Sequence, residues 1–168
     1  CVARATETLG FCPEKITVLL SSNILKNAMG VGIPGTGMIG LPIAVALGAL
    51  VGKSEYQLEV LKDLTPETLE KGKQYINGNH IDIRLKSGIT EKLYVEVRCE
   101  AEGHVATAII AHAHTNFVFV ERDGVARLDN RKPAGKEADN DDIILDMRMV
   151  HDFSTTTPLD EIRFILKT

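Results

Sequence analysis

The chain has 168 residues, 44% of them hydrophobic, which is enough for one domain with a sizeable core. Its net charge is −4, and its basic residues are scattered rather than gathered with aromatic residues, so neither nucleic acid nor a membrane surface is an expected partner. Cys1, Cys12 and Cys99 form no CxxC pair, which predicts neither a disulfide framework nor a zinc site and favours a cytoplasmic location. The longest apolar run, residues 39–51, is too short to span a bilayer.

The first half of the chain predicts one strand followed by a series of helices. The β-branched and aliphatic residues of 15–21 favour a strand. Ser22 and Asn23, which follow it, suit the start of a helix. Thr65-Pro66-Glu67 combines an N-cap residue, a first-turn proline and an acidic residue, which is a strong helix start. The expected elements are a strand over 15–21 and helices over 24–29, 39–51, 55–63 and 65–77.

The second half predicts strands joined by tight turns. Leu93, Val95, Val97 and Cys99 alternate with polar residues, which places them on one buried face of a strand and makes Cys99 a core residue. Arg122-Asp-Gly124 is a hairpin signal. The expected strands cover residues 80–85, 93–100, 105–112 and 116–121.

The last forty residues predict a loop and a final helix. Residues 128–142 are charged and polar and include Pro133 and Gly135, so we expect a mobile polar loop, and Thr157-Pro158 is expected to open a helix. Helices followed by an antiparallel meander indicate an α+β fold in two layers, with helices packed on a mostly antiparallel sheet. We expect a single α+β domain over residues 1–168 and, because the chain opens without an initiator methionine, interpret it as a fragment of a larger protein.

The glycine turn Gly35-Thr36-Gly37 leads directly into the apolar run. Glycines permit positive φ and close approach, so this turn can direct amides and one hydroxyl toward a carboxylate or phosphate. The spacing to Gly40 also matches the dinucleotide fingerprint, but Pro34 interrupts the strand that this motif requires. We therefore expect a bound carboxylate or phosphate rather than a nicotinamide cofactor.

His112-Ala-His114-Thr115-Asn116 is a second polar cluster. If the strand continues, both histidines point to one face, as a metal-binding pair would, but no carboxylate lies at ligand spacing and we predict no metal site. These side chains either bind a carboxylate or satisfy backbone groups where the strand bends. No catalytic residue is assigned, and the predicted substrate-binding residues are Asn23, Lys26, Asn27, Gly35, Thr36, Gly37, His112, His114, Thr115 and Asn116.

Small residues repeat every fourth position along the apolar run, at Gly40, Ala44, Gly48 and Gly52. On a helix they form a flat stripe where a second backbone can approach closely. The opposite side of the helix is also apolar, which indicates burial on all sides. Either this is a central core helix, or part of it faces a further domain or subunit.

Several of these motifs together resemble the L-cysteine desulfidase family, relatives of the iron–sulfur L-serine dehydratases. The resemblance is carried by Ser22-Asn23, Lys26-Asn27, Pro34-Gly-Thr-Gly37 and Leu58-Glu-Val-Leu-Lys-Asp63, and is extended by His114-Thr115-Asn116 and residues 162–166. It implies a fragment covering less than half of a family member, because the upstream Gly-Cys-Thr-Glu-Pro motif and the cluster-binding cysteines of the family have no counterpart here.

The resemblance implies a lyase that removes sulfide or water from L-cysteine or L-serine by β-elimination. A [4Fe–4S] cluster in the full-length protein would act as a Lewis acid, with no cofactor in this segment, which would supply the wall that binds the carboxylate. The implied partners are a small amino acid, the remaining domain of the longer chain and a second copy in a homo-oligomer. Two other functions stay open: a regulatory domain that binds serine or another anion, and a purely structural or interface domain.

Overall fold

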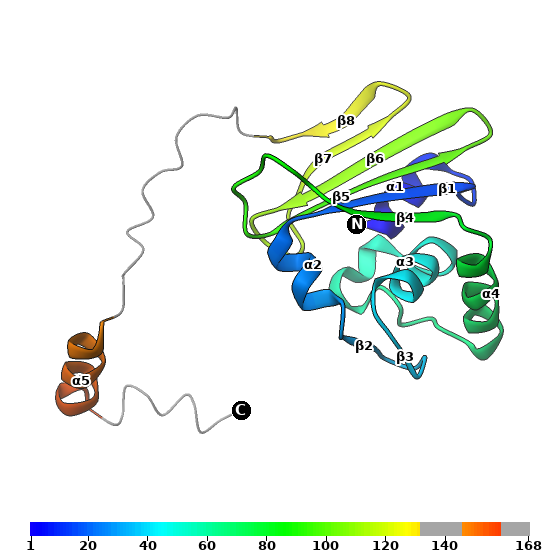
Figure 1. Ribbon diagram of the computed structural model, residues 1–168. Helices are drawn as coiled ribbons and strands as arrows, with labels where there is room; N and C mark the ends of the chain where they lie inside the picture. Colours follow the sequence, from blue (N-terminus) through cyan, green and yellow to red (C-terminus); the bar gives the residue numbers. More distant parts are fainter. Residues whose placement is uncertain (132–145, 159–168) are drawn as a thin grey trace. The chain divides into compact units, whose positions relative to one another are not determined.

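The computed structural model describes residues 1–131 and 146–158, and the chain divides into two units, Cys1–Arg131 and Lys132–Thr168 (Figure 1). The first unit contains α1 (Val2–Leu9), β1 (Lys15–Leu20), α2 (Ser22–Ala28), β2 (Gly32–Ile33), β3 (Met38–Ile39), α3 (Leu41–Leu50), the 3-10 helix η1 (Ser54–Glu59), α4 (Pro66–Asn77), β4 (Ile81–Leu85), β5 (Tyr94–Ala101), β6 (His104–Ala111), β7 (Phe117–Arg122) and β8 (Val125–Asp129). The second unit contains α5 (Met147–Thr156).

The first unit is built on a sheet with strand order β4-β1-β5-β6-β7-β8. Every neighbouring pair in it is antiparallel except β1 and β4, which run parallel with Val18 opposite Ile83. The parallel pair follows from the long connection through α2, α3 and α4, since parallel strands need a crossover. The expected two-layer α+β fold with a mostly antiparallel sheet is confirmed.

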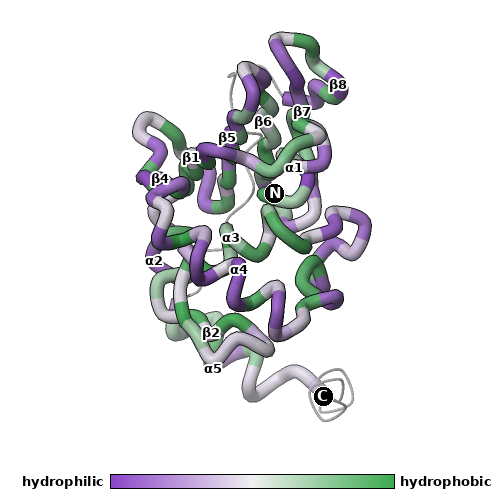
Figure 2. Tube along the Cα trace, turned by 90° about the vertical axis from the view of Figure 1, so that its right-hand side faces the viewer, coloured by the Kyte–Doolittle hydropathy of each residue, from purple (hydrophilic) through white to green (hydrophobic). Residues whose placement is uncertain are grey.

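The core lies between the helices and one face of this sheet. Alternate strand residues face it, including Ile16, Val18 and Val97, and Cys99 is 0% exposed, as its predicted core position requires. α1 packs across β5 and β6 on this face. The alternation of hydrophobic and hydrophilic residues along the strands can be followed in Figure 2.

Of the predicted stripe of small residues, Gly48 lies on α3 and Gly52 just after it, and both face α1, whereas Gly40 precedes the helix and lies beside Met29. A Cβ atom at Gly48 would lie 3.2 Å from Val2 Cβ, and one at Gly52 would lie 3.0 Å from Ala3 Cβ. On another side of α3, Gly72 of α4 leaves room for Leu47, whose Cδ2 would lie 2.8 Å from an added Cβ. Within the first unit α3 is therefore a core helix whose small residues admit its neighbours.

Several predicted elements differ from those observed. α1 was not expected at all, and the helix expected over 55–63 is only the short η1, with non-helical backbone angles at Gln57. Residues 80–85 do not open an antiparallel meander, because β4 pairs in parallel with β1. Thr157 caps the end of α5 rather than opening a helix, and the helix predicted after Pro158 lies outside the described residues.

The loop predicted over 128–142 begins too early, since its first two residues belong to β8. Residues 132–142 lie outside the described ranges. Among the helices of those ranges, none combines the length and the apolar character that crossing a membrane requires.

Candidate functional site

The glycine turn forms the end of the short β2–β3 hairpin and folds onto itself. Thr36 is 8% exposed, and its hydroxyl donates to the Ile33 carbonyl at 2.7 Å and accepts from the Met38 amide at 2.9 Å. The Thr36 amide also donates to Ile33, at 3.2 Å. Gly35 and Gly37 have φ of +76° and +64°, as the turn requires. The hydroxyl expected to bind a ligand therefore closes the hairpin.

Asn23, Lys26 and Asn27 lie on α2 with exposed side chains. Within residues 1–131 and 146–158, these three side chains make no hydrogen bond, either to the glycine turn or elsewhere. Nothing in the geometry of α2 therefore joins them to Thr36 in one site.

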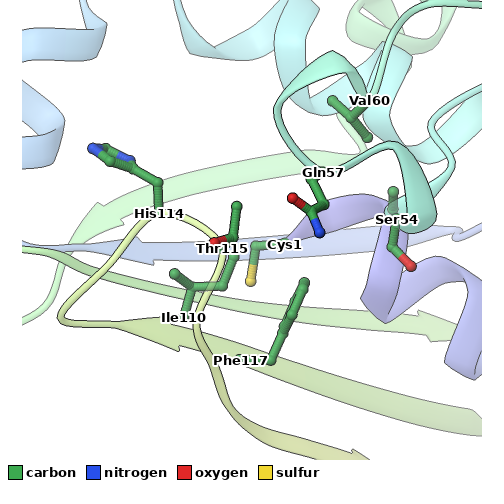
Figure 3. Close-up of a pocket in the computed structure, with 9 residues that line it drawn as sticks. Cys1, Ser54, Gln57, Val60, Ile110, His114, Thr115 and Phe117 are labelled. Carbon is green, nitrogen blue, oxygen red and sulfur yellow. The ribbon is translucent and has the colours of Figure 1, made fainter.

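A small hollow of about 70 Å³ lies elsewhere, where three segments that are far apart in the sequence meet (Figure 3). The segments are the first turn of α1, η1 with the residue after it, and the end of β6 with the connection to β7. The residues that line it are Cys1, Ala3, Ser54, Gln57, Val60, Ile110, His114, Thr115 and Phe117. Two predicted site residues, His114 and Thr115, are among them.

The connection that carries His114 and Thr115 is a compact turn rather than an extension of the strand. β6 ends at Ala111, and His112 has φ of +69°. The two histidines therefore do not share the face of one strand, which removes the basis for a metal-binding pair. Asn116 is exposed, and its side-chain amide donates to the Ala111 carbonyl at 3.0 Å. His112 and Asn116 do not line the hollow.

The polar groups of the hollow fall into two kinds. The hydroxyl of Ser54 is already used, since it donates to the carboxylate of Glu7 at 2.5 Å. In contrast, the side chains of Gln57, His114 and Thr115 make no hydrogen bond to any residue of the described ranges. These three are free to bind a ligand through an amide, an imidazole and a hydroxyl.

The rest of the hollow is apolar and includes Val60, Ile110 and Phe117. The thiol of Cys1 also lies there, within 3.3 Å of the Ala108 carbonyl oxygen. No side chain of Asp, Glu, Lys or Arg lines the hollow in the described part of the chain. A few directional polar groups over an apolar floor are typical of small-molecule sites.

The described residues do not fit an iron–sulfur cluster. No group of three His, Cys, Asp or Glu residues within the described ranges could hold a metal ion. Cys12 is exposed, whereas Cys99 is buried beside Thr6, and this burial raises the pKa of the Cys99 thiol to about 11. Cluster ligation needs converging thiolates, and these sulfur atoms have separate surroundings.

Sequence reasoning missed most of this hollow. Gln57 belongs to a segment that was predicted as regular helix, and Cys1 and Ala3 belong to a helix that was not predicted. The only available signal was the polar run at residues 112–116. The lining of the hollow depends on tertiary contacts that no local motif encodes.

The fold and the hollow define a two-layer α+β domain with a candidate small-molecule site. No family model matches the chain, and no solved structure matches it. It is similar to UPF0597 protein BF3560 of Bacteroides fragilis, with 64% identity over 168 residues, which cover 100% of this chain and 39% of the relative. UPF0597 proteins of Parabacteroides distasonis (53% identical, 99% of this chain and 39% of the relative) and Aeromonas hydrophila (37% identical, 97% and 38%) are also similar. The chain spans about two fifths of the length of these relatives.

This comparison corrects the family assignment. The prediction that the chain is a member of the L-cysteine desulfidase family is wrong, because relatives at 37–64% identity are named UPF0597 proteins and no cysteine desulfidase is named among them. Glycine turns and helices with small residues serve structural purposes in many folds. Here Thr36 closes its own hairpin and Gly48 lets α1 approach α3, so these motifs do not specify a reaction.

Proposed function

We propose that this domain binds a small amino acid in the hollow between α1, η1 and the β6–β7 connection, as the substrate-binding part of a larger enzyme. One observation carries the proposal: the exposed side chains of Gln57, from η1, and of His114 and Thr115, from the β6–β7 connection, line one hollow and have no hydrogen-bond partner among the described residues. Polar side chains that converge without partners are suited to a ligand.

The surroundings favour a carboxylate group on that ligand. Thr115, the amide of Gln57 and the imidazole of His114 supply hydrogen-bond donors. The first turn of α1, where Ala3 lies, adds the positive end of a helix dipole. The apolar wall at Ile110 and Phe117 suits a small side chain better than a charged one.

The proposal also includes the rest of the enzyme and its location in the cell. The relatives are more than twice as long as this chain, so further segments are proposed to complete the enzyme. Cys1, Cys12 and Cys99 are all free thiols, which suits the reducing cytoplasm.

The test is calorimetric titration of the 168-residue chain with L-serine and with L-cysteine. Thr115→Val keeps the shape of the side chain and removes its hydroxyl. A hydrogen bond to a charged group is worth about 1.5–3 kcal/mol, so we expect the Kd to rise about tenfold or more. Thr36→Val, which alters the β2–β3 hairpin instead, is expected to leave the Kd unchanged.

Thr107→Val is the matched control, because Thr107 is a half-buried threonine of β6 that lies opposite Arg98 and Glu121, away from the hollow. The proposal fails if the unaltered chain binds neither amino acid. It also fails if Thr115→Val and Thr107→Val bind equally well, and a loss confined to Thr36→Val would return the site to the glycine turn.

A further inference from the structure

The connection between β6 and β7 contains an unusual backbone turn centred on His112. The amide of Ala113 donates to the carbonyl of Ala111 at 2.9 Å, which closes a three-residue γ-turn, and His112 in its centre has φ of +69°. This form of the γ-turn is rare and strained for residues other than glycine. Such strain persists only where the surrounding structure holds it in place.

Asn116 makes several of the hydrogen bonds that stabilise this γ-turn. Its side-chain amide donates to the Ala111 carbonyl at 3.0 Å, so the oxygen that closes the γ-turn accepts a second hydrogen bond from the far end of the connection. The backbone amide of Asn116 donates to the Ala113 carbonyl at 3.1 Å. The backbone carbonyl of Asn116 accepts from the backbone amide of Ala111 at 3.3 Å. Both ends of the connection are thereby joined through one residue.

None of these hydrogen bonds uses the side chain of His114 or of Thr115. His112 is fixed through its amide, which donates to the Leu93 carbonyl at 3.1 Å beside β5. Between the γ-turn and Asn116 stand His114 and Thr115, and both line the hollow (Figure 3). The direction of these two side chains therefore depends on the closed form of the turn.

We propose that Asn116 is a positioning residue, whose carboxamide holds the γ-turn at His112 and thereby keeps His114 and Thr115 at the hollow that they line. This inference rests on the function proposed above. It replaces the expectation that Asn116 itself contacts the ligand, because its amide is already bonded to Ala111.

The test uses Asn116→Asp in the 168-residue chain, titrated with L-serine. At pH 7 the new carboxylate cannot donate and repels the Ala111 carbonyl, so we expect the Kd to rise at least tenfold. When the pH is lowered to about 4.5, the carboxylic acid regains a donor, because a hydrogen bond from the neutral form raises the pKa of the acid above its usual value. At that pH, the Kd of Asn116→Asp divided by the Kd of the unaltered chain is expected to fall toward one.

Two further variants separate positioning from a general loss of structure. Asn116→Ala removes the donor without adding a charge, and it should show the loss at pH 7 with no recovery in acid. Asn130→Asp makes the same substitution at an exposed position after β8 and should follow the unaltered chain at every pH.

A second measurement does not depend on the ligand. The amide resonances of Ala113, His114 and Thr115, and the coupling constant that reports φ of His112, should shift in Asn116→Asp at pH 7 and return on acidification. Binding by Asn116→Asp equal to that of the unaltered chain at pH 7 would overturn the inference and leave the proposed function standing. If the unaltered chain binds neither L-serine nor L-cysteine, the proposed function fails, and unchanged resonances would then overturn the inference separately.

Discussion

Replacing Gln57 by glycine should stabilise the protein. Gln57 has φ of +51° and ψ of −108°, angles close to those of the first central residue of a type II′ turn, where glycine is favoured. Its neighbours keep the chain in this form. Lys53 Nζ lies 2.6 Å from the carboxylate of Asp63, and the Ser54 amide donates to the carboxylate of Glu7 at 2.6 Å. The turn is fixed from both ends, so the strain at Gln57 is not released.

The expected gain is the difference between two terms. A residue held in a sparsely populated region costs about 1–3 kcal/mol, which glycine removes. Glycine loses more conformational freedom on folding, which costs roughly 0.5–1 kcal/mol. Because the side chain of Gln57 is exposed and makes no hydrogen bond within the described residues, little else is lost. Gln57→Gly should therefore raise the free energy of unfolding by up to about 2.5 kcal/mol.

The matched control is Gln74→Gly, at an exposed position inside α4. There the backbone is helical, and glycine should lower stability by up to about 1 kcal/mol. Urea unfolding followed by circular dichroism, without ligand, measures both variants. Melting temperatures should move in opposite directions, by about 2–4 °C for each kcal/mol. A Gln57→Gly protein that is destabilised as much as Gln74→Gly would refute the reasoning.

Two further predictions concern the core. Gly52→Ala should lower the free energy of unfolding by about 1–3 kcal/mol, because its Cβ would lie 2.5 Å from the Gly48 carbonyl oxygen, whereas Gly30→Ala, with no atom within 4 Å, should have no such effect. Equal unfolding midpoints would contradict this close approach. Cys99 should resist a thiol reagent at pH 8 that labels the exposed Cys12, and its rapid labelling in the folded protein would be inconsistent with its burial. Because the folded-state pKa of about 11 lies above the usual value, the contribution of the neutral Cys99 thiol to stability is complete below pH about 8.5 and is lost as the pH rises toward 11.

Local signals predicted those elements whose sequence determines them locally. α4 begins where Thr65 was expected to cap it, and Thr65 and Thr68 form a reciprocal capping box. The alternation through Val97 and Cys99 likewise identified the buried face of β5. Such alternation fixes which residues point inward but not which strand lies alongside. The parallel pairing of β4 with β1 depends on the crossover through the helices, so it could not be predicted from residues 81–85 alone.

The site was predictable only in part, for the same reason. His114 and Thr115 stood out because polar residues interrupt an apolar strand pattern. Gln57 did not, because residues 55–63 have no local signal for the break in η1 at this position. Thr36 was expected to face a ligand because glycines flank it, but a threonine between two glycines can equally accept and donate within its own turn. The sequence does not distinguish these two uses.

The distribution of strained backbone gives the hollow independent support. Five non-glycine residues of the described ranges have positive φ. Glu102 and Asp123 lie in the tight turns of the β5–β6 and β7–β8 hairpins, where positive φ is common, and Asn79 follows the end of α4, where asparagine often adopts it. The remaining two are Gln57, which lines the hollow, and His112, which precedes its other polar residues. Strained backbone gathers at functional sites, and here a residue other than glycine, Asn or Asp takes positive φ in both segments that supply unpartnered polar groups to the hollow.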